Sequence, residues 1–523
     1  MILGVNALNI RTWEALEESL VPLRKDSKEW RIFHYLPAMI YFPAGLVTLA
    51  LDSIGKVFSY AASFFSRDKR DPNKDFTAIL DDSRKWKELR QSEVSFDSDF
   101  LFGTATCTYQ DSGAVNCPDS QWAKWEKKVV RENNRSGKSA DLFQLYQSDE
   151  GRNQIINRLK KLGLNSYRFS IEWSQIEPKE GVFDETKLQV YVNFCKALRK
   201  NGIAPMVTLH HFSEPDWFHK KGSFEKEENI EHFIRFAEKV FLPLTQEYKS
   251  KPLVEHICTI NEPAVEAFSR YVRGAFSPGY ICRFNKAGQF LKGALKANCI
   301  AYEKLKALNP RVQIGIVHQR LAMIATNPLL QPTVRYINRL VNDTTLRFFK
   351  TGIFSYKIPL CAHIREEGLN PKTDFVGLQY YTRPVIGLTG STSYHEPMTA
   401  MPFREDPEGL YEASLEVYDA FKVPIIITEN GISTHDPKQR ERYLARALYA
   451  TYRAQQKIGV ENLRGYHYWS FCENAEWDMG LHPQSFGAYG LNTNGTLAPN
   501  PREGMMPLIQ VAKNRSKVIL KVA

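Results

Sequence analysis

The sequence of 523 residues predicts an α/β fold, a (β/α)8 TIM barrel preceded by an N-terminal apolar and charged extension. Three observations support this prediction. Short apolar runs typical of buried strands recur from about residue 97 onward, there are eight of them, and helical patterns separate most of them. Strands that alternate with helices indicate parallel βαβ units, and nearly continuous hydrophobicity is typical of a sheet buried on both faces.

The predicted strands are similar in length, and most of them end in polar residues. In chain order they are FLFGTAT (100–106), NSYRFSI (165–171), IAPMVTL (203–209), HICTINE (256–262), QIGIVHQ (313–319), DFVGLQYY (374–381), PIIITEN (424–430) and GYHYWSF (465–471). Segments such as ETKLQVYVNFCKALRKNG, between two of these runs, repeat apolar residues at the helical period. The active site of such a barrel gathers at the carboxyl ends of its strands, so the polar residues found there are the candidates for function.

The N-terminal extension, residues 1–95, is expected to lie outside the barrel domain of residues 96–523. Its first twenty residues contain three glutamates and no basic segment, which argues against a secretory signal peptide. Residues 36–65 form two apolar blocks, the first too short for a spanning helix. They predict either a membrane-associating segment or a helix packed on the barrel. The charged stretch 66–95 is expected to be a linker.

Charge and cysteine content narrow the function classes. The net charge is +11, but 58 acidic residues are interspersed with 69 basic ones and there is no long basic run with interleaved aromatics, so no nucleic-acid partner is expected. The eight cysteines are scattered without a C-x-x-C pair, which fits a reducing compartment. Basic residues flank 36–65 on both sides. We therefore expect a cytoplasmic protein that is not secreted, with possible peripheral membrane association through that segment.

Two glutamates end apolar runs in similar settings. Glu262 ends HICTINE and is followed by proline, and Glu429 lies in PIIITENG. A carboxylate at the end of a buried strand loses solvation, so two of them at one barrel mouth require an explanation. The sequence shows no histidines or aspartates spaced as metal ligands near either motif, so no metal or cofactor is expected. Cleavage of a glycosidic bond needs two such carboxyl groups, one as proton donor and one facing the anomeric carbon.

With these motifs in view, residues 97 to 515 resemble glycoside hydrolase family 1, the retaining β-glucosidase group. TINEP resembles the family's acid/base signature and ITENG its nucleophile signature. The resemblance implies retaining hydrolysis of a β-D-glycoside through a covalent glycosyl-enzyme, with Glu262 as acid/base and Glu429 as nucleophile. It also implies that Arg168 holds Glu429 ionised and that Tyr381 donates a hydrogen bond to it. We expect these two partners to depress the pKa of Glu429 while the pKa of Glu262 is raised.

The resemblance also implies a set of sugar-binding residues. Gln110 and His211 match residues that bind hydroxyls near the sugar 3-position, and Asn261 matches the residue that binds the 2-hydroxyl. The remaining matches are an aromatic floor and a pair that contacts the 3-, 4- and 6-hydroxyls: Trp469, Glu476 and Trp477. Aromatic rings pack against the apolar faces of sugars, and carboxylates and amides form hydrogen bonds with sugar hydroxyls.

Several positions depart from the family pattern and leave the sugar and the leaving group open. They are Gln379 in place of asparagine, Phe212 in place of tryptophan, Glu473 and Ala475 within the DNFEW stretch, and Ser485 in place of arginine. Family members that act on 6-phosphosugars usually lack the equivalents of Glu476 and Trp477, so a non-phosphorylated sugar is favoured. Two alternatives remain, a glycolipid-directed transglycosylase that uses the same intermediate and a catalytically silent sugar-binding module.

Overall fold

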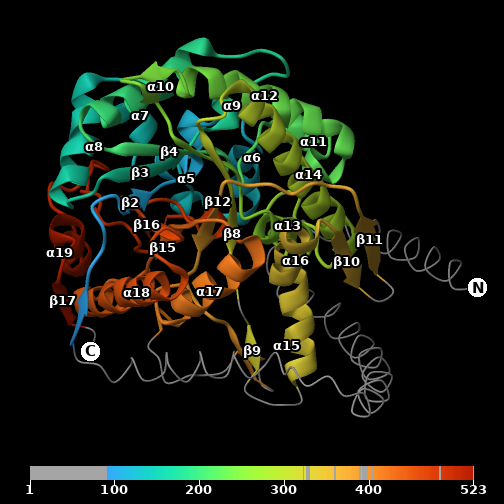
Figure 1. Ribbon diagram of the computed structural model, residues 1–523. Coiled ribbons are helices and arrows are strands. Elements are labelled where there is room, and N and C mark those ends of the chain that lie inside the picture. Colours follow the sequence, from blue (N-terminus) through green and yellow to red (C-terminus); the bar gives the residue numbers. More distant parts are fainter. Residues whose placement is uncertain are drawn as a thin grey trace, which may run out of the picture.

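The fold is known from a computed structural model, which describes residues 91–321, 323–325, 330–358, 361–387, 390–391, 398–401, 404–481 and 484–521. Eight parallel strands form a closed barrel, and helices surround it (Figure 1). The barrel strands follow one another in chain order: β2 (Leu101–Ala105), β3 (Ser166–Ser170), β4 (Ala204–His210), β7 (His256–Asn261), β8 (Gln313–Gln319), β12 (Phe375–Gln379), β15 (Ile425–Asn430) and β16 (Leu463–Trp469). Each overlaps one of the eight predicted runs, so the predicted TIM barrel is confirmed.

Helices follow most of the barrel strands and cover the barrel. The larger ones are α8 (Asp149–Lys161), α10 (Glu185–Lys200), α12 (Ile230–Leu244), α14 (Phe284–Leu308), α17 (Gly409–Phe421) and α18 (Pro437–Ile458), and three shorter ones are α13 (Pro263–Tyr271), α16 (Thr344–Thr351) and α19 (Met506–Asn514). Side-chain caps fix where some of them begin. The Ser148 hydroxyl accepts from the Gly151 amide at α8, and the Asp184 carboxylate accepts from the Lys187 amide at α10.

Shorter elements lie in the loops and at the barrel rim. The helices are α5 (Thr108–Asn116), α6 (Gln121–Val129), α7 (Leu142–Tyr146), α9 (Trp173–Ile176), α11 (Asp216–Lys220) and α15 (Gln331–Asn338). The strands are β5 (Glu247–Tyr248), β6 (Lys251–Pro252), β9 (Ile324–Ala325), β10 (Phe354–Ile358), β11 (Ala362–Glu366), β13 (Val385–Gly387) and β14 (Gly390–Ser391).

One strand pair extends the folded domain beyond the predicted boundary. β1 (Gln91–Val94) pairs antiparallel with β17 (Val518–Lys521). The predicted linker ran to residue 95, but this pairing makes residues 91–94 part of the barrel domain. The segment 36–65 lies outside the described residues. Among the helices that the structure describes, none combines the length and apolar character needed to cross a membrane.

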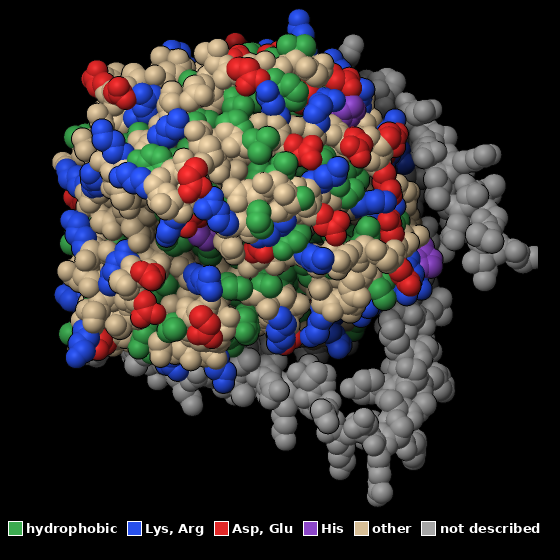
Figure 2. Space-filling model, turned by 45° about the horizontal axis from the view of Figure 1, so that its top comes forward, with side chains coloured by type: hydrophobic (Ala, Val, Ile, Leu, Met, Phe, Trp, Pro, Cys, Tyr) green, Lys and Arg blue, Asp and Glu red, His purple; other side chains and the backbone are tan. Residues whose placement is uncertain are grey.

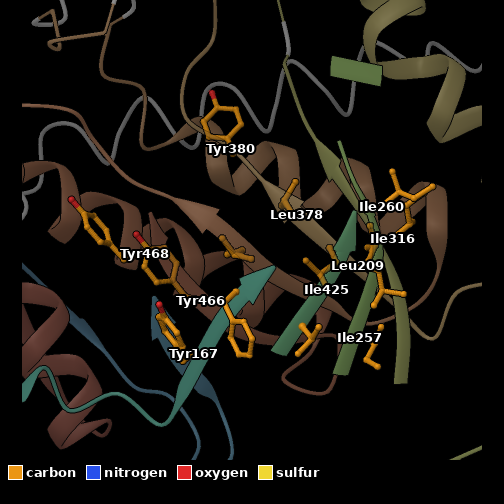
Figure 3. Packing of buried hydrophobic residues seen from close by; sticks show 14 of the residues in the cluster. Tyr167, Leu209, Ile257, Ile260, Ile316, Leu378, Tyr380, Ile425, Tyr466 and Tyr468 are labelled. Atoms are coloured by element: carbon orange, nitrogen blue, oxygen red, sulfur yellow. The ribbon is translucent and has the colours of Figure 1, made fainter. Parts of the chain in front are cut away.

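Strand alternation places the core and the site on opposite faces of the sheet. Tyr167 and Phe169 of β3 pack outward in the large hydrophobic cluster between strands and helices, together with residues such as Leu209 and Ile316 (Figure 3). Arg168, between the two, has no exposed surface and points into the barrel, where its side chain meets strand β15. The apolar pattern of a strand therefore decides which polar side chain reaches the barrel interior.

The surface carries both signs of charge. Figure 2 shows lysines and arginines interspersed with aspartates and glutamates over the face that it presents, without a continuous basic area. On this face the distribution agrees with the interspersed acidic and basic residues of the sequence.

Candidate active site

Glu429 lies at the carboxyl end of β15 and is 4% exposed. Its carboxylate is held from two sides. Arg168 Nη1 donates a short hydrogen bond to Oε1, and the Tyr381 hydroxyl donates to Oε2 at 2.7 Å. A guanidinium and a phenol on separate oxygens fix both the charge and the orientation of this carboxylate.

The Arg168 guanidinium is fixed by three barrel strands. Besides its contact with Glu429, Nη2 donates to Asn261 Oδ1 at 2.6 Å and Nε donates to Thr208 Oγ1 at 3.1 Å. Gln379 Nε2 donates to the same Asn261 oxygen at 2.9 Å. The Gln379 departure thus keeps an amide where the family has one, and it helps to orient Asn261.

Glu262 directly follows β7 and begins α13. Its φ is +44°, in the left-handed region, and Pro263 occupies the first turn of the helix, where no amide donor is needed. The strand pairing of β7 with β8 also shifts register between Cys258 and Asn261, next to this residue. The TINEP sequence therefore makes a sharp strand-to-helix turn that holds a carboxyl group at the barrel mouth.

The two carboxyl groups differ in their electrostatic surroundings. Burial raises the pKa of Glu262 well above its ordinary value, and the charge of Glu429 raises it further. Burial also raises the pKa of Glu429, while the charge of Arg168 and the hydrogen bonds from Tyr381 and Arg168 lower it. Arg168 and Tyr381 thus lower the pKa of Glu429 as predicted, but its net direction is upward, because desolvation of the buried carboxylate outweighs both partners. The prediction of a raised pKa for Glu262 agrees with the structure.

Glu476 follows β16, the neighbour of β15 in the barrel. Gln110 Nε2 donates to its Oε2 and Trp469 Nε1 donates to its Oε1, both at 3.3 Å. Gln110 Nε2 also donates to the Ala475 carbonyl at 2.9 Å, which anchors the amide. Burial raises the pKa of Glu476 to about 8, against the Trp469 hydrogen bond, which lowers it. Near neutral pH this pKa favours the protonated form of the carboxyl group.

His211 and Trp477 form part of an aromatic wall. The His211 ring centroid lies 6.2 Å from that of Trp469 and 6.1 Å from that of Trp477. Phe212 packs edge-on against Trp477 at 5.3 Å. Burial holds the pKa of His211 well below its ordinary value, and the charge of Arg168 lowers it further, so the ring is neutral. A neutral imidazole can accept a hydrogen bond from one sugar hydroxyl and donate one to another.

A cavity of about 230 Å³ brings the predicted residues together. Nine of the ten candidates line it, and Arg168 lies behind Glu429. The nine are Gln110, His211, Asn261, Glu262, Tyr381, Glu429, Trp469, Glu476 and Trp477. Aromatic surfaces and convergent polar groups in one concave site are typical of sugar binding.

The other departures have structural partners. The Arg502 guanidinium donates to Ser485 Oγ at 2.7 Å and also contacts the Glu473 carboxylate. An arginine from elsewhere in the chain thus contacts the side chain at the position where the family pattern has arginine. The Phe212 carbonyl accepts from Trp122 Nε1 at 3.0 Å.

Sequence reasoning missed further residues that line the cavity. The apolar ones are Val265, Phe276, Leu321, Met401, Met479 and Phe486, and the polar ones are Ser269, Arg273, Gln319, Arg320, Thr382 and Asp478. Gln319 and Arg320 could have been found, because they end a predicted strand and follow it directly. Thr382 likewise follows the predicted run 374–381, Val265 and Ser269 lie on α13 directly after Glu262, and most of the others come from loops whose path the sequence pattern does not predict.

One buried cluster has the composition of a metal site. His210, Glu214 and Glu266 place ligand atoms near one another. Arg270 forms ion pairs at 2.8 Å with both glutamates, so a guanidinium already supplies the positive charge. This arrangement is a buried ion-pair network rather than a cation site.

Comparisons with known proteins agree with this geometry. The family model described as glycosyl hydrolase family 1 matches residues 92–516. The chain is 29% identical over 503 residues to β-glucosidase 21 of Arabidopsis thaliana, covering 82% of this chain and 92% of that protein. It is 26% identical over 454 residues to a 6-phospho-β-galactosidase of Streptococcus mutans, covering 75% of this chain and 92% of that one.

Solved structures show the same fold. A β-glycosidase from Pyrococcus horikoshii superposes with a TM-score of 0.71 at 30% identity, covering 82% of this chain and 97% of that one. A β-glucosidase from Thermotoga maritima, bound to glucoimidazole, gives a TM-score of 0.71 at 24% identity over 81% of this chain and 99% of that one. The barrel, its cavity and the family match over most of the sequence lead to one conclusion: the chain belongs to glycosyl hydrolase family 1 and is a glycosidase.

Proposed function

We propose that this glycosidase hydrolyses β-D-glycosides of non-phosphorylated sugars with retention of configuration. The observation that carries the proposal is the pair of buried carboxyl groups at the barrel mouth. Both line one cavity, and only Glu429 is held by the Arg168 guanidinium and the Tyr381 hydroxyl. Unequal surroundings suit unequal roles: two partners favour the charged form of the nucleophile, and burial favours the protonated form of the acid.

In the proposed first step, Glu429 attacks the anomeric carbon while Glu262 protonates the departing oxygen. The bond to the leaving group breaks as the ester bond to Glu429 forms. In the second step Glu262 takes a proton from water, water attacks the anomeric carbon, and Glu429 leaves as carboxylate. This mechanism requires the two carboxyl groups to be about 5–5.5 Å apart. Asn261, oriented by Arg168 and Gln379, is the proposed partner of the 2-hydroxyl.

The stereochemistry of the first product tests this proposal. Proton NMR of a reaction with 4-nitrophenyl β-D-glucoside should show the β-anomer of glucose first, with the α-anomer appearing later by mutarotation. Two displacements at the anomeric carbon give this result, whereas a single displacement by water inverts it. The α-anomer as first product would overturn the assignment of Glu429 as nucleophile.

Glu476 is the residue expected to disfavour a phosphorylated sugar. Its carboxyl group is buried and lies on the side of the cavity where Gln110 and Trp469 are found. A phosphate there would meet Glu476 and, beyond it, Glu429, whose charge acts on Glu476. The Arg168 guanidinium already donates hydrogen bonds to Glu429 and Asn261, so it does not offset the charge of a phosphate. The relatives named as 6-phospho-β-galactosidases make this distinction worth measuring.

We expect kcat/KM at pH 9, where Glu476 is ionised, to be about 100-fold or more higher for a β-glucoside than for its 6-phosphate, because like charges placed together cost several kcal/mol. The phosphate is a dianion above a pH of about 6. Since the pKa of Glu476 is about 8, its charge appears between pH 7 and pH 9 and should widen the preference about tenfold. Assays of both substrates across this range check the prediction.

Glu476→Gln is the matched control for this pH dependence. The amide keeps the size of the side chain but cannot ionise, so the ratio of the two kcat/KM values should stay constant between pH 7 and pH 9. Titration of Glu262 and Glu429 affects both substrates and cancels in the ratio. A ratio that widens equally in the variant would show that Glu476 is not the group responsible.

A further inference from the structure

Arg320 is a buried arginine that the proposed chemistry does not use. It directly follows β8, lines the cavity and is 6% exposed. Its backbone amide donates to the Gln379 carbonyl at 2.9 Å, which fixes the chain at the point where the side chain departs. An arginine at the carboxyl end of a barrel strand is in a position typical of functional residues.

The guanidinium of Arg320 is only partly satisfied. Its Nε donates to Glu416 Oε2 and its Nη2 donates to Glu416 Oε1, both at 2.7 Å. This two-pronged pair with α17 holds the plane of the guanidinium rigidly. Nη1 is buried and has no hydrogen-bond partner in the part of the chain that the structure describes. A buried charged donor without an acceptor is costly, so the site is built for an acceptor that arrives from the cavity.

The place of Arg320 in the barrel indicates which part of a substrate it meets. Gln110, which follows β2, and Glu476, which follows β16, lie on adjacent strands of the barrel, whereas β8 is separated from both and is the neighbour of β7. Glu262, which follows β7, is the proposed donor to the departing oxygen. The β8 side of the cavity is therefore the leaving-group side.

The charges around Arg320 select the chemistry of that acceptor. Glu416 already balances the guanidinium charge. The same cavity contains the Glu429 carboxylate, whose negative charge disfavours an anionic leaving group. Gln319 and Thr382 line the cavity as well and add neutral polar groups. A neutral oxygen, such as a hydroxyl or ring oxygen of a second sugar, fits these surroundings best.

We propose that Arg320 Nη1 donates a hydrogen bond to a neutral oxygen of the leaving group and so makes the enzyme favour glycosides in which a sugar or polyol is released. The inference rests on the proposed β-glycosidase function. It assigns Arg320 as a specificity-determining residue.

Arg320→Lys tests the assignment. A lysine can keep an ion pair with Glu416, but its single ammonium group cannot also replace the Nη1 donor that is proposed to bind the leaving group. The substrates are a β-linked glucose disaccharide, cellobiose, and phenyl β-D-glucoside, whose phenyl group carries no polar substituent. A hydrogen bond to a charged group contributes about 1.5–3 kcal/mol, so kcat/KM for cellobiose should fall by about tenfold or more. The value for the aryl glucoside should change by less than about twofold, because it makes no such bond.

Arg383→Lys is the matched control. Arg383 is also buried and also pairs with carboxylates, Asp406 at 2.9 Å and Glu412 at 2.7 Å, but it does not line the cavity. Its replacement should leave the ratio of the two kcat/KM values unchanged, even if stability falls. If the ratio changed in both variants, the cause would be a general effect of disturbing a buried arginine pair. If it changed in neither, Arg320 would have no role in the choice of leaving group.

The outcomes separate the inference from the function on which it rests. Wild-type enzyme that cleaves neither substrate contradicts the proposed function and the inference together. Wild-type enzyme that cleaves only the aryl glucoside contradicts the inference alone, as does an Arg320→Lys variant with an unchanged ratio. A selective loss on cellobiose in Arg320→Lys, absent in Arg383→Lys, supports the role of Arg320.

Discussion

Replacing Glu429 with glutamine should lower kcat for 4-nitrophenyl β-D-glucoside by about 10⁴-fold or more, the scale on which enzymes lose activity without their nucleophile. The amide has the shape of the carboxyl group but cannot form the covalent intermediate. The substitution also leaves the buried Arg168 guanidinium without its ion pair, and an uncompensated buried charge costs about 3–5 kcal/mol. The variant should therefore be less stable as well as inactive, and both properties have to be measured.

Glu429→Asp separates these two effects. The shorter side chain keeps a negative charge near Arg168 and Tyr381 but withdraws the carboxylate from the anomeric carbon, so activity should fall steeply while thermal stability stays nearer to that of the wild type. Initial rates and thermal unfolding followed by circular dichroism are the measurements. A Glu429→Gln variant within tenfold of wild-type activity would exclude Glu429 as the nucleophile.

The barrel was predictable because its strands are defined by short-range patterns. Runs such as QIGIVHQ are long enough to cross the barrel once, they are apolar throughout, and helical patterns separate most of them. Parallel strands bring their carboxyl ends to one face, so Glu262 and Glu429 could be expected in one site although 166 residues lie between them. β1 was not predicted, since its pairing with the far end of the chain leaves no local pattern.

The sequence predicted which residues form the site better than it predicted their pKa values. The family resemblance pointed to Arg168 and Tyr381 as partners of Glu429, and the structure places both on its carboxylate. The net direction of the Glu429 pKa depends on how completely the group is buried, which is a property of the assembled barrel. The pairing of Arg320 with Glu416 likewise joins the end of one strand to a distant helix, and no spacing in the sequence predicts it.

The loss of Glu262 should affect the two steps of the reaction differently. In Glu262→Ala, a good leaving group such as nitrophenolate departs without protonation, so the glycosyl-enzyme still forms, but its hydrolysis is slowed because no base activates water. We expect an initial burst of nitrophenolate followed by turnover reduced by about 10²–10⁴-fold, the usual contribution of general acid–base catalysis. For cellobiose, whose leaving group needs the proton, kcat/KM should fall by a similar factor and no burst should appear.

Azide provides a decisive measurement on this variant, because it is a nucleophile that needs no general base. It should accelerate turnover of the aryl glucoside by Glu262→Ala and give a β-glucosyl azide, since it attacks the intermediate from the face that water uses. Glu266→Gln is the control, because Glu266 is a buried glutamate in the next helical turn that pairs with Arg270 and does not line the cavity. It should show neither a burst nor acceleration by azide. If azide leaves Glu262→Ala unchanged, or yields the α-azide, then Glu262 is not the group that serves both as acid in the first displacement and as base in the second.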